Sequence, residues 1–264
     1  MKYLLNNLSK IEEKLRSSEG VIIMLDFDGT LSPIAPTPYQ AILPKSIKSL
    51  LSKCSKLFPI VIISGRSLKD IKTRVGLKDL VYAGNHGLEW QIGKKINCLP
   101  VSKEVVSSLL SIKKSVKKIL RIYPGVLLED KHPSLAIHYR QLDSSLLASF
   151  KKDIDKITRL SSNKNILQVL RGKKVIELRP NLNWNKGKFA LFICKYFQNK
   201  LRLKLLPMYV GDDKTDEDVF CAFDKDITVR VGQSKTSDAK YYLKNVVQIK
   251  LFLKWFVATK FNKQ

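Results

Sequence analysis

The sequence predicts an α/β fold with a second, inserted domain of α+β type. Short and nearly all-apolar runs alternate with segments of helical periodicity at both ends of the chain, which is typical of parallel strands covered by helices on both faces. The middle of the chain has a different pattern, a long helix followed by two strand-like runs, and this pattern occurs twice. We therefore expect a Rossmann-like, doubly wound parallel sheet as the core, formed by residues 1–98 and 181–264, and an αββαββ domain at 99–180.

The core strands are expected to be short and buried on both faces. The strand candidates are Val21–Leu25, Pro59–Ile63, Leu80–Ala83, Met208–Val210 and Ile227–Val231. A helix is predicted at Pro44–Lys56, because proline suits the first helical turn, and another at Lys186–Phe197, where apolar residues recur along one face.

Two amphipathic helices are predicted in the inserted domain. Apolar residues recur at helical spacing from Val105 to Ile119 and again from Leu147 to Ile157. Strand-like runs at 126–128 and 135–139 follow the first helix, and runs at 166–170 and 174–178 follow the second. The Arg171–Lys173 stretch predicts the hairpin turn of the last pair.

The strongly basic composition raises the hypothesis of a nucleic-acid partner. The chain has 48 Lys and Arg against 23 Asp and Glu, a formal net charge of +25, and clustered basic residues bind phosphate backbones. The basic residues are spread over every predicted helix, however, and the densest face, Lys113–Arg121, has no interleaved aromatics. We therefore expect a solvated lysine-rich surface and no nucleic-acid partner, with a basic nucleic-acid-binding protein on this fold as the alternative.

Neither a membrane segment nor a disulfide framework is expected. The longest early apolar run, Val21–Leu25, is too short to span a bilayer, and residues 1–20 lack the apolar core of a signal peptide. The four cysteines are widely spaced and form no C-x-x-C pair. We expect a cytoplasmic protein with reduced cysteines and no membrane contact. The sequence does not indicate the oligomeric state, and a monomer is compatible with it.

Acidic residues follow the first core strand directly, in Asp26-Phe27-Asp28-Gly29-Thr30. In parallel α/β sheets ligands bind beyond the carboxyl ends of the strands, so both carboxylates are expected to project into a site. With one residue between them, the two side chains can lie near one reacting atom. Taken alone, the same segment is also compatible with an acidic turn.

Other strand ends and helix starts carry polar residues of matching chemistry. The Ser64-Gly65-Arg66 segment offers a hydroxyl and backbone N–H groups to a phosphate oxygen, and Gly211–Asp216 adds the carboxylates of Asp212, Asp213 and Asp216. The pair Lys186-Gly187 opens a helix before that strand. Each segment has an ordinary interpretation as a helix cap or surface lysine. Their occurrence in this order favours one common site.

These segments, D-F-D-G-T, S-G-R, K-G and G-D-D-x-T-D, resemble the four motifs of haloacid dehalogenase-type phosphatases over essentially the whole core. Three shorter segments, Gly84–Glu89, His138–Arg140 and Val175–Pro180, resemble the trehalose-6-phosphate phosphatases within that superfamily. The resemblance implies Mg²⁺-dependent hydrolysis of a small sugar phosphate through an aspartyl-phosphate intermediate. Another sugar-phosphate phosphatase of the superfamily, acting on sucrose or hexose phosphate, is the alternative.

The resemblance also implies roles for the acidic residues. Asp26 is expected to be the nucleophile and a metal ligand, and Asp28 the general acid and base, which binds metal through its backbone carbonyl. Asp212 is expected to supply a further carboxylate ligand. Asp213 and Asp216 are expected to ligate the metal or to orient its waters and Lys186.

The phosphate is expected to contact basic and hydroxyl groups. By resemblance, Lys186 and Ser64 hold phosphoryl oxygens, and Gly65 contributes backbone contacts. The role of Arg66 stays open between a phosphate contact and a salt bridge within its loop.

The inserted domain resembles a cap that recognises the sugar. Glu129 and Lys131 stand in an E-x-K-x-x-S segment, and Glu177 lies in the last strand of this domain, so these three residues are expected to contact sugar hydroxyls. Arg140 is a fourth candidate, with an ion pair at a strand end as an equal alternative.

The loop after the third core strand supplies further substrate candidates, namely Asn85, His86 and Glu89. His86 is expected to contact sugar or to position the cap, against a purely structural hydrogen-bonding role. The rings of Trp90 and Trp184 are expected to pack rather than to stack on sugar.

Overall fold

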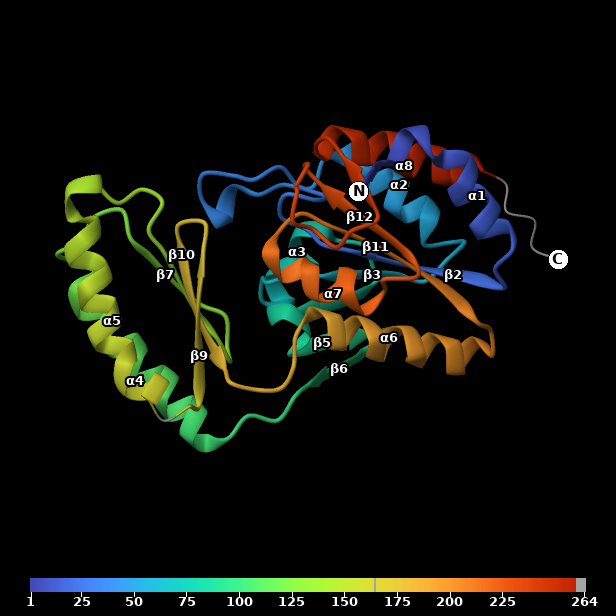
Figure 1. Ribbon diagram of the computed structural model, residues 1–264. Helices are drawn as coiled ribbons and strands as arrows, with labels where there is room; N and C mark the ends of the chain where they lie inside the picture. The colour runs from blue at the N-terminus through green and yellow to red at the C-terminus, as the bar shows by residue number, and fades with distance from the viewer. Residues whose placement is uncertain (164, 260–264) are drawn as a thin grey trace. The chain divides into compact units, whose positions relative to one another are not determined.

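The computed structural model describes residues 1–163 and 165–259. These residues form two compact units, the first of Met1–Cys98 with the chain from Trp184 onward, and the second of Leu99–Asn183 (Figure 1). The second unit therefore ends just beyond Pro180, where the sequence pattern places its boundary.

The first unit is built on a nine-stranded sheet. Its strands are β1 (Lys2–Tyr3), β2 (Gly20–Leu25), β3 (Ile60–Ile63), β4 (Val81–Gly84), β5 (Glu89–Ile92), β6 (Lys95–Cys98), β11 (Leu205–Gly211), β12 (Ile227–Val231) and β13 (Tyr241–Leu243). The spatial order is β1-β13-β12-β11-β2-β3-β4-β5-β6. All pairs from β1 to β4 are parallel, and β5 and β6 extend the sheet as an antiparallel hairpin.

Helices cover both faces of this sheet. They are α1 (Leu8–Arg16), α2 (Lys45–Cys54), α3 (Leu68–Val75), α6 (Lys186–Leu201), α7 (Glu217–Ala222) and α8 (Val246–Ala258). Alternate residues of β2 point to opposite faces, so that Ile23 packs in the core layer under α1, α2, α3 and α8, and Met24 in the layer under α6 and α7. The doubly wound core predicted from the all-apolar runs is confirmed, because strands buried on both faces need apolar residues at every position.

The second unit has the predicted αββαββ order. Its elements are α4 (Lys103–Ile119), β7 (Leu127–Asp130), β8 (Leu135–His138), α5 (Leu147–Asn163), β9 (Leu167–Gly172) and β10 (Val175–Pro180). The strands form an antiparallel sheet in the order β7-β8-β10-β9, and α4 and α5 cover one face of it (Figure 1). The predicted hairpin turn is shifted: Gly172 pairs with Val175, so the turn residues are Lys173 and Lys174.

Some elements were not predicted from the sequence. The hairpin of β5 and β6 lies at one margin of the sheet, and the short strands β1, at the other edge, and β13, next to it, lie at the opposite margin. Within residues 1–163 and 165–259, none of the helices combines the length and the apolar character that a membrane crossing requires.

Candidate active site

Four parallel strands end at one edge of the core sheet, and each is followed by a residue predicted to act in the site. Asp26 follows β2, Ser64 follows β3, Asn85 follows β4 and Asp212 follows β11. Because β11, β2, β3 and β4 are adjacent and parallel, their carboxyl ends lie side by side. The sheet topology thus gathers segments that are far apart in the sequence.

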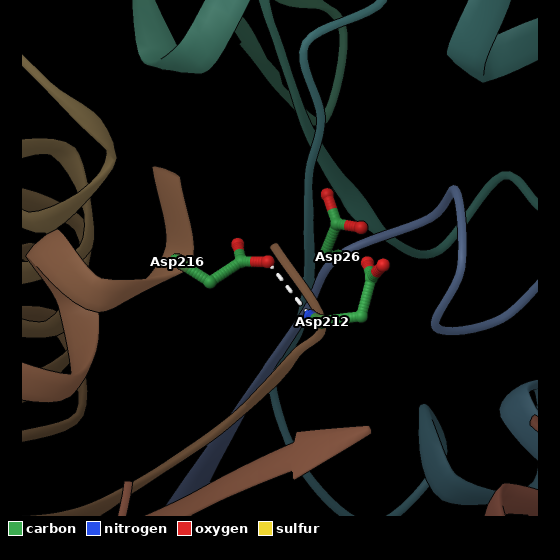
Figure 2. Close-up of side chains that lie close together, drawn as sticks. All are labelled: Asp26, Asp212 and Asp216. Atoms are coloured by element: carbon green, nitrogen blue, oxygen red, sulfur yellow. Dashed lines mark hydrogen bonds between the residues drawn. The ribbon is translucent and has the colours of Figure 1, made fainter. Parts of the chain in front are cut away.

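Three carboxylates form a cluster at this edge. Asp26, Asp212 and Asp216 each offer an oxygen atom within 4.8 Å of those of the other two (Figure 2). The approach of Asp212 requires the glycine of D-F-D-G-T, because Gly29 has φ +81° and a Cβ there would lie 2.2 Å from Asp212 Oδ2. Thr30 lies beside the same carboxylate, with its Oγ1 3.4 Å from Asp212 Oδ1.

Lys186 bridges two of these carboxylates at the start of α6. Its Nζ donates to Asp26 Oδ1 at 2.7 Å and to Asp216 Oδ1 at 2.8 Å, and its side chain is only 2% exposed. Burial opposes the charged amine, but Asp216 and Asp26 raise the pKa of Lys186 well above its ordinary value. Lys186 is therefore a buried cation, held between the ends of β2 and β11.

The carboxylate of Asp216 accepts hydrogen bonds from four donors. Its Oδ1 accepts from Lys186 and from the hydroxyl of Tyr209, and its Oδ2 accepts from the backbone amides of Asp212, at 2.8 Å, and Asp213, at 3.0 Å. Figure 2 shows the bond to the Asp212 amide. A carboxylate bound in this way orients its neighbours.

Asp213 lies outside the three-carboxylate cluster. Its Oδ1 accepts from the backbone amide and the hydroxyl of Thr215, at 2.8 and 2.7 Å, so it caps the short turn that precedes α7. The structure thus brings together Asp26, Asp212 and Asp216 of the predicted acidic residues.

The carboxylate cluster fits a hard divalent cation. Burial raises the pKa of Asp26 well above its ordinary value, and Asp216 and Asp212 add to the rise while Lys186 opposes it. Burial, with Asp216 and Asp213, raises the pKa of Asp212 to about 7. Crowded carboxylates repel one another when ionised, and a cation bound by their oxygens relieves that repulsion.

Asp28 is bound by Arg66. Arg66 Nε donates to Asp28 Oδ2 at 2.7 Å and Arg66 Nη2 donates to Oδ1 at 2.6 Å, so the guanidinium holds both carboxylate oxygens. Of the two roles left open for Arg66, the structure shows the salt bridge. One partner, Asp28, lies on another segment, and the second partner, Asp70, lies four residues further along the same segment.

The loops after β3 and β4 are joined by their backbones. The amide of Asn85 donates to the Arg66 carbonyl at 2.7 Å, and the amide of His86 donates to the Ser64 carbonyl at 2.9 Å. Asn85 and His86 have φ values of 49° and 58°, in the left-handed region that few non-glycine residues occupy. Gly65 is required here, because a Cβ would lie 2.8 Å from the His86 ring.

Glu89 and the two tryptophans have structural partners in the first unit. Glu89 Oε1 accepts from the Asn85 side chain at 2.8 Å and from the Leu68 amide at 2.7 Å, which ties the loop to the start of α3. Trp184 donates through Nε1 to the Gly87 carbonyl at 2.9 Å, and Trp90 packs on aromatic residues of α6. The expectation that both tryptophans pack is consistent with these contacts.

The second unit places its predicted sugar-contacting residues on one face of its sheet. Glu129 and Glu177 both pair with Ala136, so all three project from the face opposite α4 and α5. Lys131 Nζ donates to Glu177 Oε1 at 3.0 Å, and His138 Nε2 lies 2.9 Å from Glu129 Oε2. Two hydrogen-bonded side-chain pairs therefore lie close together on this face.

Arg140 lies beyond the end of β8. It is exposed, and its Nη2 donates to the Lys173 carbonyl at 3.2 Å, in the turn between β9 and β10. The structure thus gives Arg140 a backbone partner, and a role in sugar binding stays a prediction.

A comparison with known protein families identifies the chain. Residues 24–247 match the family model of trehalose-phosphatase. The chain belongs to the trehalose-phosphatase family. The matched region includes both units, from the end of β2 to the start of α8.

Individual relatives of this trehalose-phosphatase family member agree. The chain is 30% identical over 257 residues to the probable trehalose-phosphate phosphatase 4 of Oryza sativa subsp. japonica, covering 93% of this chain and 69% of that protein. It is 34% identical over 206 residues to the trehalose-phosphate phosphatase of Mycobacterium tuberculosis, covering 75% of this chain and 50% of that protein.

Solved structures show the same fold. A trehalose-6-phosphate phosphatase related protein matches with a TM-score of 0.78 at 25% identity, over 90% of this chain and 97% of that one. The C-terminal domain of Candida albicans trehalose-6-phosphate phosphatase matches with a TM-score of 0.83 at 24% identity, over 96% and 97% of the two chains.

Sequence reasoning missed three residues that contact the predicted site residues. Tyr209 lies within an apolar strand, and its hydroxyl binds Asp216. His138 occurs in a segment that resembles the family, but only its neighbour Arg140 was singled out. Asp70, which binds Arg66 from the first turn of α3, has no sequence motif that would have indicated it.

Proposed function

We propose that this protein hydrolyses trehalose 6-phosphate to trehalose and inorganic phosphate. The observation that supports this proposal most strongly is the geometry of Asp26 in a member of the trehalose-phosphatase family. Asp26 lies at the end of β2, one of its oxygens is held by the buried Lys186, and Asp212 is close by. This is the arrangement that a carboxylate nucleophile needs, since its approach to a dianionic phosphate must be oriented and shielded.

The proposed metal is Mg²⁺. Asp26 and Asp212 would hold it through carboxylate oxygens and Asp28 through its backbone carbonyl. Asp213 and Asp216 would orient the metal-bound waters and the neighbouring side chains. When bound, Mg²⁺ supplies positive charge that shields the carboxylates and the substrate phosphate from each other.

Hydrolysis then proceeds in two displacements. Asp26 attacks phosphorus, the bond from phosphorus to the sugar oxygen breaks, and trehalose leaves with a proton supplied by Asp28. Water next attacks the aspartyl phosphate, loses a proton to Asp28, and releases inorganic phosphate and free Asp26. Lys186, held near Asp26 by its bond to Asp216, stabilises the negative charge on the transferred phosphoryl group.

Phosphate binding is assigned to the loops after β3 and β4. Ser64 is fully buried and directly follows β3, the strand next to β2. We assign its hydroxyl and the Gly65 backbone to a phosphoryl oxygen. Asn85, His86 and Glu89 belong to the same loop network, in which Glu89 orients Asn85. The left-handed backbone at Asn85 and His86 supports a functional role for this loop, since such conformations concentrate at functional sites.

Residues 99–180 are assigned to sugar recognition and the remaining core, 1–98 and 181–264, to catalysis. Glu129, Lys131 and Glu177 present charged donors and acceptors on one sheet face, which suits the hydroxyl groups of a sugar. Arg140 is retained as a further candidate.

Phosphate release from a panel of sugar phosphates tests the proposal. The purified protein with Mg²⁺ is expected to hydrolyse trehalose 6-phosphate faster than sucrose 6-phosphate or glucose 6-phosphate, and excess EDTA is expected to stop the reaction. A preference for another sugar phosphate would contradict the proposed substrate but not the proposed two-step hydrolysis. Full activity in EDTA would contradict the assigned metal.

A further inference from the structure

A chain of ion pairs extends from Asp28 into α3. Arg66 holds both oxygens of Asp28, and its Nη1 donates to Asp70 Oδ2 at 2.7 Å. The same oxygen of Asp70 accepts from Arg74 Nε at 2.8 Å. Arg74 Nη1 in turn donates to the Ala41 carbonyl at 2.6 Å. The chain therefore connects Asp28 with the loop that precedes α2.

Arg66 is fixed on several sides. Its side chain is only 8% exposed, whereas that of Asp28 is 41% exposed. The guanidinium carbon lies 5.6 Å from the centre of the Phe27 ring, and the Arg66 amide donates to Ser64 Oγ at 3.1 Å. A half-exposed carboxylate thus depends for its orientation on a buried cation that other residues immobilise.

This arrangement matters for a residue that transfers protons. Proton transfer to the departing sugar oxygen requires Asp28 to lie within hydrogen-bond reach of that atom, and a free aspartate at the surface would rotate between several rotamers. The two parallel N–H bonds from a guanidinium define the plane and the direction of a carboxylate. Burying the Arg66 guanidinium without a partner would cost free energy of desolvation, and the pairing with Asp28 offsets that cost. A specific role for this pair explains why Arg66 is buried here.

We propose that Arg66 is a positioning residue, which orients Asp28 for catalysis and is itself held by Asp70 and Arg74. The proposal rests on the proposed function of Asp28 as the general acid and base. Three of the five N–H groups of Arg66 are directed at Asp28 and Asp70, which supports a role that Arg66 exerts through Asp28. In the first displacement, the Asp28 oxygen that carries the proton is released from Arg66 and gives this proton to the leaving oxygen, while the other oxygen keeps its bond to Arg66. In the second displacement, Asp28 regains a proton from the attacking water.

The test compares two aryl phosphates that differ in leaving group, phenyl phosphate and p-nitrophenyl phosphate. Arg66→Gln is expected to lower kcat for phenyl phosphate by about 10 to 100-fold, within the usual contribution of acid–base catalysis, and to leave KM within about twofold, because phosphate binding is retained. The loss should be smaller for p-nitrophenyl phosphate, whose leaving group needs little protonation. A large rise in KM with unchanged kcat would overturn the proposal in favour of phosphate binding.

A double-mutant cycle decides whether Arg66 acts through Asp28. In an Asp28→Asn background, Arg66→Gln is expected to cause little further loss of kcat, because the residue that it positions is already inactive. If the losses of the two single variants multiply in the double variant, Arg66 acts independently and the proposal is wrong. Asp70→Asn is expected to show the same leaving-group dependence with a smaller loss.

Two further variants separate positioning from folding. Arg66→Lys keeps the positive charge but cannot hold both oxygens in one plane, and it is expected to recover part of the kcat lost in Arg66→Gln. Arg16→Gln removes a matched but exposed Arg–Glu pair on α1 and is expected to leave kcat unchanged. Equal losses for both aryl phosphates in Arg66→Lys would overturn the proposal.

The two proposals can fail separately. A wild-type protein that hydrolyses the aryl phosphates but not trehalose 6-phosphate contradicts the proposed substrate, and the leaving-group comparison still decides the role of Arg66. A wild-type protein that hydrolyses trehalose 6-phosphate but neither aryl phosphate keeps the proposed substrate, and the double-mutant cycle of Arg66 and Asp28, measured with trehalose 6-phosphate, then decides the role of Arg66.

Discussion

The charged residues of the two units are organised in different ways. In the core, Lys186 and Asp216 are almost completely buried, and the bonds that hold them come from β2, β11, α6 and the turn before α7. In the second unit, Glu129 pairs with His138 and Lys131 pairs with Glu177 on a single sheet face. The side chains of the first pair are 18% and 21% exposed, and those of the second pair are 9% and 13% exposed. Each of these pairs is formed by residues of the same small domain.

This difference indicates what each region is suited to do. Removing one partner from a buried ion pair leaves an uncompensated charge and typically costs about 3–5 kcal/mol, so the core cluster has a strongly determined geometry. The side chains of the pairs in the second unit are 9–21% exposed, more than those of Lys186 and Asp216, so we expect sugar hydroxyls to replace their partners at lower cost than in the core. We therefore expect core substitutions to affect every substrate, and substitutions in the second unit to affect only substrates that carry the sugar.

The largest effect is expected for the nucleophile. Asp26→Asn should reduce hydrolysis of both trehalose 6-phosphate and p-nitrophenyl phosphate by about 10⁴-fold or more, because an amide does not attack phosphorus usefully. Acid quenching with labelled substrate should then recover no phosphoenzyme. Recovery of a phosphorylated Asp26→Asn protein would assign the nucleophile to another residue. The contrast between a catalytic core and a sugar-binding second unit would then no longer rest on Asp26.

An intermediate and substrate-dependent effect is expected in the second unit. A hydrogen bond to a charged group contributes about 1.5–3 kcal/mol, so Glu177→Ala and Glu129→Ala should lower kcat/KM for trehalose 6-phosphate by roughly 10 to 150-fold. Hydrolysis of p-nitrophenyl phosphate should change little, since it has no sugar. The matched control is Asp130→Ala on β7, because Asp130 pairs with Lys113 rather than with the two-pair face.

Equal losses for both substrates in Glu177→Ala would show that this residue supports folding. No loss for either substrate would show that the sugar is recognised elsewhere.

A smaller effect on stability is expected for Tyr209→Phe. The change removes a buried hydroxyl that donates to Asp216, and should lower the free energy of unfolding by about 1–3 kcal/mol. Tyr82→Phe is the control, because its hydroxyl donates to the Leu77 carbonyl at 2.6 Å, away from the cluster. Thermal unfolding should detect both changes, while kcat should fall in Tyr209→Phe alone. Unchanged kcat in Tyr209→Phe would mean that Lys186 and the two amides suffice to hold Asp216.

The smallest effect concerns pH. The pKa of Asp212 rises from 3.8 to about 7 in the folded protein, so between these values the folded state keeps a proton that the unfolded state releases. Stability without metal should therefore fall as pH increases through this window, and stay low above it. A cation competes with that proton, so Mg²⁺ should raise Tm by more near pH 8 than near pH 5.

Asp212→Asn should make the effect of Mg²⁺ on Tm smaller and less dependent on pH. An unchanged pH dependence in this variant would assign the effect to other groups, with Asp26 as the first candidate.

Local patterns in the sequence determined a large part of this fold. The apolar runs of β2, β3, β4, β11 and β12 indicated a sheet buried on both faces, and helical periodicity indicated α2, α4, α5 and α6, because burial and period are properties of neighbouring residues. The position of Asp26 and Asp212 at strand ends was also visible in the sequence, since a strand that ends in a carboxylate places it at the sheet edge.

Only the tertiary structure decided how the charged side chains are partnered. That Asp216 is bound by Tyr209 and two amides, that Asp213 caps its own turn, and that Arg66 holds Asp28 depend on atoms brought together from distant segments. The edge strand β1 likewise pairs with β13 across almost the whole chain. Hydrogen bonds and ion pairs depend on distances of a few ångströms and on direction. The spacing of residues along the sequence does not contain that information once the segments are far apart.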